Sequence, residues 1–373
     1  MLPILAPSNI QLLLERAAQF ADTAYEAAES TDVEAVIHPR LWEAFHRSGL
    51  AMAAFPEAVG GSGLGEGNRH GELCTVLRLL GAGDLSLARL FEGHVNAISL
   101  VGRYGTQQQL LSLADSVAEG ALSAVWGADD AAGLKIVREG GRAELRGRKI
   151  LASGAGLVTR PLVTAKADDG QVMCLLNLLP DSEVDLSGWT AQGMRSTATG
   201  AVELTGIAVG PDEIVGDPGD FMRQPHFSGG AWRFCAAHVG AMERLVALFR
   251  DQLVSRGRGA DPYQLQRVAQ GVASARTARF WVEEAARRLG AEESDPESVV
   301  AFANLTRMVT ERSALDVMEA VQRGVGLVSF VRPNPIERIC RDLSTYLRQP
   351  VPDLAMSDAA RAFLASASAV GEF

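Results

Sequence analysis

The stretch GAVELTGIAV, residues 200–209, indicates what the middle of the chain forms. Apolar residues recur at short intervals over a brief run between glycines, which is typical of a β-strand. Similar runs lie over residues 121–215, including RAELRGRKILAS (142–153), RPLVTAKA (160–167) and QVMCLLNLL (171–179), and are divided by Gly, Asp and Pro turns. Together they predict a small sheet or barrel.

Helical patterns flank this segment on both sides. Residues 10–120 are rich in helix formers and place apolar residues at three- and four-residue spacing, as in LSLARLFEGHVNAISLVGRYG (85–105). From about residue 225 the helical period returns, with two apolar stripes that predict long amphipathic helices of a bundle. The stripes are formed by Val239, Met242, Val246, Phe249 and Leu253, and by Phe302, Leu305, Val309, Leu315, Met318 and Val321.

The order of these patterns predicts the fold class and the domains. We expect a multidomain α+β protein with an N-terminal helical domain over residues 1–120. A small β-sheet or β-barrel domain is expected over 121–222, and a C-terminal domain of the four-helix-bundle type over 223–373. A chain of 373 residues is long enough for two or three such units, because domains typically hold about 100–200 residues.

Composition and charge narrow the class of protein. A hydrophobic fraction of 47% with 21% charged residues is typical of a folded globular protein. The net charge of −10 and a pI near 5.2 argue against nucleic acid and against an anionic membrane surface as partners. An anionic ligand therefore needs a local basic pocket.

Further sequence patterns predict the cellular compartment and whether a metal site is present. The N-terminus MLPILAPSN has no basic opening segment, and no run of about 18 apolar residues occurs, so we expect neither a signal peptide nor a membrane span. The four cysteines lie far apart without a CxxC pair, which favours buried free thiols in a reducing cytoplasm. The six histidines show no metal-ligand spacing, so no metal site is predicted.

Five motifs in order resemble one known family over most of the chain. They are FPEAVGGSGLG (55–65), GRKILASGAG (147–156), GMRSTATGAVELTGIAV (193–209), QRGVGL (322–327) and NPIERICRD (334–342). In this order they are similar to the motifs of the acyl-CoA dehydrogenase family of flavoproteins. The glycine-rich loop in the first motif lacks the strand–loop–helix setting of a Rossmann fingerprint and is interpreted as a packing turn.

The resemblance implies that FAD is bound between the β domain and the helical bundle. Ser153 matches a Ser/Thr whose hydroxyl donates to the flavin N5 atom, and its alternative interpretation is a turn serine bonded to nearby backbone. Arg256 or Arg258 matches an arginine that reaches the FAD pyrophosphate of a neighbouring subunit.

The late glutamine–glycine turn carries the rest of the implied cofactor site. Gln322, Gly324 and Gly326 match the turn under the adenine end of the cofactor, again contributed by the partner subunit. The resemblance therefore implies a homodimer or homotetramer, and an electron-transfer partner is compatible with the family.

One cofactor motif departs from the family pattern. Where the family has a threonine and a glutamate that open a loop, this chain has Trp126 and Gly127, and the loop is shorter. Trp126 is interpreted either as flanking the isoalloxazine or as filling the space that the shortened loop leaves.

The stretch RDLSTYLRQPVPD (341–353) departs at the catalytic base. Family dehydrogenases carry a glutamate eight residues after the RD pair, and here that position is Pro350. Some members carry the base near the arginine loop instead, where this chain has Gly257 or Arg258. Asp353 is the nearest acid, either a relocated base or a surface or capping aspartate.

His94 is a further candidate. It lies on a helix that borders the substrate side of the flavin in this family, where flavin monooxygenases of the same fold use polar residues. The alternative is a helix histidine with both ring nitrogens satisfied by the fold.

Three functions are compatible with these residues. The first is an atypical FAD-dependent dehydrogenase that oxidises an acyl thioester, bound to CoA or to a carrier, at its α,β bond. The second is a flavin monooxygenase on the same fold with another small-molecule substrate. The third is a non-catalytic relative that binds a ligand or partner, because fold alone does not fix function.

Overall fold

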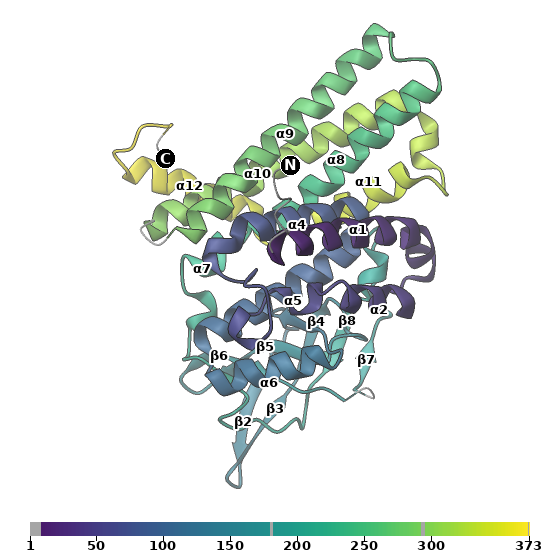
Figure 1. Ribbon diagram of the computed structural model, residues 1–373. Helices are drawn as coiled ribbons and strands as arrows, with labels where there is room; N and C mark the ends of the chain where they lie inside the picture. Colours follow the sequence, from purple (N-terminus) through teal and green to yellow (C-terminus); the bar gives the residue numbers. More distant parts are fainter. Residues whose placement is uncertain (1–8, 180–181, 292–294, 372) are drawn as a thin grey trace, which may run out of the picture.

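The computed structural model describes residues 9–179, 182–291, 295–371 and 373. Helices, then strands, then helices follow one another along the chain, so the predicted three-part α+β fold is confirmed (Figure 1). The first eight residues, on which the expectation about a signal peptide partly rests, lie outside the described residues. None of the described helices is long and apolar enough to cross a bilayer.

The N-terminal part consists of helices that pack on one another and on the middle sheet. Their bounds are α1 Asn9–Glu34, α2 Pro39–Arg47, α3 Leu50–Ala53, α4 His70–Gly83, α5 Leu85–Tyr104 and α6 Gln107–Ala118. The start of α5 is fixed by Asp84, whose carboxylate accepts a hydrogen bond from the Leu87 N–H at 2.8 Å. Thr106 and Gln109 form a capping box at the start of α6.

The middle part contains two sheets rather than one closed barrel among the described residues. The larger sheet has the order β3-β2-β5-β6-β9 with β1 paired to β5, and the smaller has the order β4-β8-β7. Their bounds are β1 Ser123–Trp126, β2 Lys135–Glu139, β3 Arg142–Arg146, β4 Arg148–Ala152, β5 Arg160–Ala167, β6 Gly170–Leu175, β7 Val184–Asp185, β8 Gly200–Glu203 and β9 Ile214–Val215. Strand β1 also packs against α5, which joins the sheet to the helices.

The C-terminal part is a bundle of long helices followed by two shorter ones. Their bounds are α7 His226–Gly229, α8 Trp232–Ser255, α9 Pro262–Gly290, α10 Pro296–Val325, α11 Pro335–Tyr346 and α12 Pro352–Ala365. Asp261 and Asp295 cap α9 and α10, each directly before a proline that suits the first helical turn. The first predicted stripe faces the core, whereas Leu315 of the second is 36% exposed.

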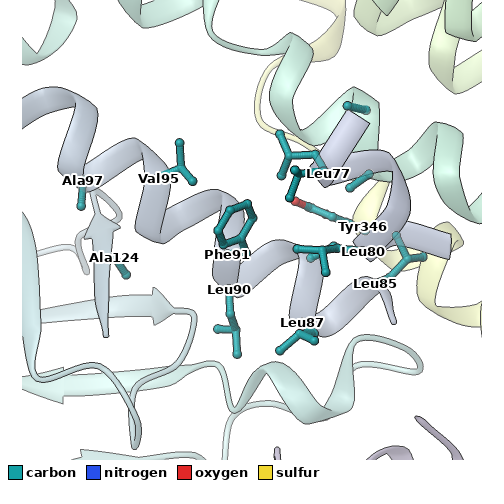
Figure 2. Packing of buried hydrophobic residues seen from close by; sticks show 14 of the residues in the cluster. Leu77, Leu80, Leu85, Leu87, Leu90, Phe91, Val95, Ala97, Ala124 and Tyr346 are labelled. Atoms are coloured by element: carbon teal, nitrogen blue, oxygen red, sulfur yellow. The ribbon is translucent and has the colours of Figure 1, made fainter. Parts of the chain in front are cut away.

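One buried hydrophobic cluster extends through the parts of the fold. Leu77 of α4, Phe91 of α5 and Tyr346 of α11 belong to it (Figure 2). Trp126 of β1 and Phe249 of α8 belong to it as well. The cluster therefore joins the sheet to both helical parts.

Helix α11 also connects the parts through charged side chains. The Arg341 guanidinium donates to both carboxylate oxygens of Asp32 in α1, at 3.0 and 2.7 Å, and to the Gln192 carbonyl at 2.7 Å. The next residue, Asp342, accepts from the Met194 N–H at 2.7 Å. Burial, together with the nearby carboxylate of Asp84, raises the pKa of Asp342 to about 7.

Helices α4 and α8 cross at glycines that leave no room for a side chain. A Cβ atom at Gly240 would lie 1.9 Å from the Arg78 carbonyl oxygen, and one at Gly81 would lie 2.1 Å from the Ala237 carbonyl oxygen. The two backbones thus touch directly, and any larger residue at Gly240 must push the helices apart.

We expect Gly240→Ala to lower the thermal unfolding midpoint, because overpacking of this kind costs roughly 1–3 kcal/mol. The control is Gly102→Ala in α5, where an added Cβ meets no atom within 4 Å. Alanine there raises helix propensity and should leave the midpoint unchanged or higher. Equal midpoints for the two variants would contradict the close crossing.

Candidate functional site

Ser153 lies in a tight turn directly after β4. The turn is held by the Gly154 N–H, which donates to Thr197 at 2.7 Å, and by the Ala155 N–H, which donates to Ala198 at 3.0 Å. Gly154 has a φ of +74°, which glycine adopts without strain. The half-buried Ser153 hydroxyl is thereby set beside η3 (Arg195–Thr197).

The hydroxyl of Ser153 retains its proton for a ligand. The Thr199 hydroxyl donates to Ser153 Oγ at 3.4 Å, a long contact in which Ser153 is the acceptor. Among the contacts of the described residues, Ser153 Oγ donates to no protein group. A hydroxyl with a free proton at this turn fits a flavin ring nitrogen as its acceptor.

Trp126 lies at the end of β1 and supports the same turn. Its side chain is 2% exposed, and its indole N–H donates to the Ser153 carbonyl at 3.0 Å. Burial of the indole in the core favours the interpretation that Trp126 fills space. The hydrogen bond adds a second role, because it fixes the backbone of Ser153.

Lys149 holds the shortened loop, and its role was not inferred from the sequence. Its side chain is fully buried, and Nζ contacts the Asp129 carboxylate at 2.5 Å and the Thr164 hydroxyl at 3.0 Å. Burial lowers the pKa of Lys149, and Asp129 opposes that shift. The loop after Trp126 is thus pinned to β4. A lysine inside a predicted strand was the available signal.

His94 is a core residue with both ring nitrogens bonded. Its Nδ1 accepts from the Ser123 N–H at 3.0 Å, and its Nε2 lies 2.8 Å from the Ala51 carbonyl oxygen. The side chain is 0% exposed. The structure therefore favours the structural interpretation of His94 over the catalytic one.

The loop between α11 and α12 carries Pro350 at the position where the sequence comparison with the family predicted the base. The Pro350 carbonyl accepts from Arg307 Nη2 at 2.6 Å, and the Gln349 amide donates to the Tyr346 carbonyl at 2.7 Å. Asp353 is exposed in the first turn of α12, where it borders a cavity. Of the residues proposed from sequence as bases, Asp353 alone faces a cavity.

The residues predicted to contact the partner's cofactor lie in the bundle. Arg258 is exposed in the α8–α9 connection and pairs with Asp261 at 2.8 Å, and Arg256 is exposed at the end of α8. Gln322 and Gly326 border an open hollow of about 720 Å³.

Gly324 has a packing reason of its own. A Cβ atom there would lie 2.2 Å from Phe249 Cζ, so the glycine permits α8 and α10 to approach.

These two groups of residues lie in different parts of the fold. Strand β4, which leads into Ser153, belongs to the β part, whereas the α8–α9 connection lies at the far tip of the bundle (Figure 1). One chain therefore brings Ser153 and Trp126 together but keeps them apart from Arg256 and Arg258.

A charged network between α5 and α8 was not predicted from the sequence. Arg89 contacts Glu92 at 2.5 Å, and Arg233 of α8 donates to Asn96 at 2.9 Å while its Nε lies 4.0 Å from Glu92. Glu92 and Arg233 are 6% and 8% exposed. The spacing of residues 89, 92 and 96 on one helical face was the available signal.

Among the described residues, no three His, Cys, Asp or Glu side chains gather in a way that could hold a metal ion. The four cysteines are buried and free.

A helical part, a sheet part and a helical bundle that carry a serine turn beside η3 define a flavoprotein-type fold. Family comparison identifies it: residues 8–121 match the N-terminal domain of acyl-CoA dehydrogenases, and residues 232–348 match the C-terminal domain. The chain belongs to the acyl-CoA dehydrogenase family. No protein with a curated description matches the chain significantly.

Solved structures share the fold at low identity. The dibenzothiophene monooxygenase TdsC from Paenibacillus sp. A11-2, in complex with FMN and indole, is 20% identical, with a TM-score of 0.82 and coverage of 94% of this chain and 97% of that chain. KijD3 in complex with FMN and a dTDP-sugar is 20% identical, with a TM-score of 0.83 and coverage of 97% and 94%. Butyryl-CoA dehydrogenase from Megasphaera elsdenii is 18% identical, with a TM-score of 0.83 and coverage of 97% and 100%.

Buried histidines should make the protein sensitive to acid. Burial lowers the pKa of His94 to about 4 and of His238 to about 3, below the ordinary 6.5 that applies in the unfolded chain. The folded state then binds fewer protons, so stability is complete above pH 6.5 and falls as the pH falls toward 4, by on the order of 3 kcal/mol for His94.

We therefore expect His94→Gln, which cannot titrate, to show a shallower loss of unfolding free energy between pH 7 and pH 5 in urea titrations. His38→Gln is the control, because His38 is exposed at the start of α2. If the unfolding free energy of His94→Gln fell with pH as steeply as that of the unmodified protein, the lowered pKa of His94 would be contradicted.

Proposed function

We propose that the protein is a flavin-dependent oxidoreductase that does not carry out standard acyl-CoA dehydrogenation and acts as a monooxygenase on a small substrate. One observation carries the proposal: Pro350 replaces the base, and its carbonyl is bonded to Arg307. Removal of an α-proton needs a basic side chain within hydrogen-bond reach. Oxygen transfer does not need that base.

The charged network supports the same proposal. By resemblance, α5 borders the substrate side of the flavin. Glu92, Asn96 and Arg233 fill the space between α5 and α8 with ion-paired and hydrogen-bonded groups. Burying a straight apolar chain there would break these contacts and leave buried charges unpaired, at a cost of several kcal/mol.

The chain's own residues would hold the flavin as follows. When bound, the flavin supplies the electron transfer and the reaction with oxygen. Ser153 would donate its free proton to a ring nitrogen, and Trp126 and Lys149 keep that turn and the adjoining loop in place. Their preformed geometry limits the conformational freedom lost on binding.

The cofactor proposed is FAD shared between two chains. Strand β4, which leads into Ser153, lies beside the N-terminal helices, whereas the α8–α9 connection that carries Arg256 and Arg258 lies at the far tip of the bundle, which supports a dinucleotide held by two subunits (Figure 1). This supports a homodimer or homotetramer. FMN has no pyrophosphate and would need only the Ser153 end. The four free buried thiols support a reducing, cytoplasmic setting.

A second candidate is atypical acyl thioester dehydrogenation with Asp353 as a relocated base. The observation in its favour is that Asp353 borders a cavity beside Pro350. Such a reaction would pass its electrons to a separate electron-transfer partner.

The purified protein should be yellow, with about one flavin per chain. The double variant Arg256→Gln/Arg258→Gln should bind FAD at least tenfold more weakly and bind FMN unchanged, because arginine–phosphate bonds are charge-assisted. Equilibrium titration of reconstituted protein measures both. Arg250→Gln is the control, because Arg250 is exposed on α8 and pairs with Asp251. Equal loss of FAD and FMN would contradict the shared-cofactor arrangement.

Butyryl-CoA under nitrogen should bleach the bound flavin extremely slowly or not at all, since a general base typically contributes about 10²- to 10⁴-fold. Stopped-flow absorbance measures the rate. The bleaching rate of Pro350→Glu is compared with that of Pro350→Gln, because glutamine has nearly the same shape as glutamate but is not a base. Fast bleaching in the unmodified protein would overturn the proposal, and its loss in Asp353→Asn would establish the second candidate.

A further inference from the structure

A cavity of about 430 Å³ lies between α8, α10 and the start of α12. This volume is within the range of small-molecule sites, roughly 300–1,000 Å³. Part of the wall is apolar and is formed by Phe234, Met308, Leu347 and Met356. The cavity can therefore enclose the body of a small organic molecule.

Of the three arginines in the wall, two are paired with carboxylates. Arg348 contacts Glu311 at 2.6 Å, and Arg312 contacts Asp316 at 2.5 Å. Arg307, in contrast, has no carboxylate within 4.0 Å among the described residues, and its Nη2 donates to the Pro350 carbonyl. Burial lowers the pKa of Arg307. The nearby Glu311 carboxylate opposes this shift without contacting Arg307, so the partly desolvated guanidinium can still bind an anion.

His238 contributes a buried ring to the same wall. The side chain is 1% exposed, and its Nε2 has no hydrogen-bond partner among the described residues. The ring packs edge-on against Tyr346 with 4.6 Å between centroids, which fixes its orientation. Burial lowers the pKa of His238 to about 3, so the ring is neutral and adds no charge to the wall.

We propose that this cavity binds a small organic carboxylate with an apolar body. The carboxylate meets Arg307, and the body packs against Phe234, Met308 and Met356. A carboxylate is favoured over a phosphate because a single unpaired cation faces the cavity, while Glu311 and Asp353 in the wall repel a dianion. Carboxylate and arginine match in planar geometry, which allows two parallel hydrogen bonds.

Arg307 links the cavity to the loop between α11 and α12. The same guanidinium that would meet the ligand holds the Pro350 carbonyl at 2.6 Å, and Gln349 and Pro352 are part of the wall. A bound carboxylate would therefore restrain this loop. The proposal does not depend on bound flavin, so its failure leaves the proposed function untouched.

Isothermal titration of the purified full-length protein with benzoate tests the proposal. Benzoate should bind, and benzyl alcohol and inorganic phosphate should each bind at least tenfold more weakly. Arg307→Gln should weaken benzoate at least tenfold, whereas Arg307→Lys should retain part of the affinity. Arg312→Gln is the matched control, since Arg312 lies in the same wall but is paired with Asp316.

A second variant keeps the proposal testable if Arg307→Gln fails to fold. Met308 is 41% exposed at the rim, so Met308→Trp should fold and should block benzoate by filling the opening. The proposal is overturned if benzoate does not bind, if benzyl alcohol or phosphate binds equally well, or if Arg307→Gln and Met308→Trp both leave the affinity unchanged.

Discussion

The adjacent side chains of Arg341 and Asp342 determine how the parts of this chain are joined. Arg341 donates a hydrogen bond to each carboxylate oxygen of Asp32, and the Asp342 carboxylate accepts one from the Met194 N–H. A Cβ at Gly193 would lie 2.3 Å from the Arg341 carbonyl oxygen, so this approach requires a glycine. Helix α1, the segment before η3 and helix α11 are thus fixed together, and the Ser153 turn and the loop at Pro350 take their positions from them.

The sequence predicted the order of the parts because each local pattern agrees with its final environment. Val239, Met242 and Phe249 recur at helical spacing and are buried in α8. The RD pair was visible as a motif, but its partners Asp32 and Met194 are some 309 and 148 residues away along the chain. Such pairings follow from tertiary packing, which periodicity does not encode. The division of the strands into two sheets was hidden for the same reason.

The histidines show why the site was harder to predict than the fold. His94 and His238 are both buried, both on long helices and both low in pKa. From the sequence, His94 was the candidate because its helix borders the substrate side of the flavin in the family. The structure places backbone partners on both nitrogens of His94 but leaves Nε2 of His238 without one among the described residues. The two histidines differ in whether backbone groups lie within hydrogen-bond distance of their ring nitrogens. The backbone groups that bond His94 come from segments distant in sequence, so the sequence pattern does not reveal them.

Pro350 also makes a contact of its own in this loop. A proline has no N–H, so its carbonyl is the polar group that its backbone offers, and Arg307 takes it. In the family dehydrogenases that the RD motif resembles, the matching position carries the glutamate base. Here the Pro350 carbonyl accepts a hydrogen bond from Arg307 instead, and Arg307 lines a cavity. In our proposal the loop therefore holds an anion where the family dehydrogenases hold a group that removes a proton, which is a change in the chemistry of the loop and not merely a loss.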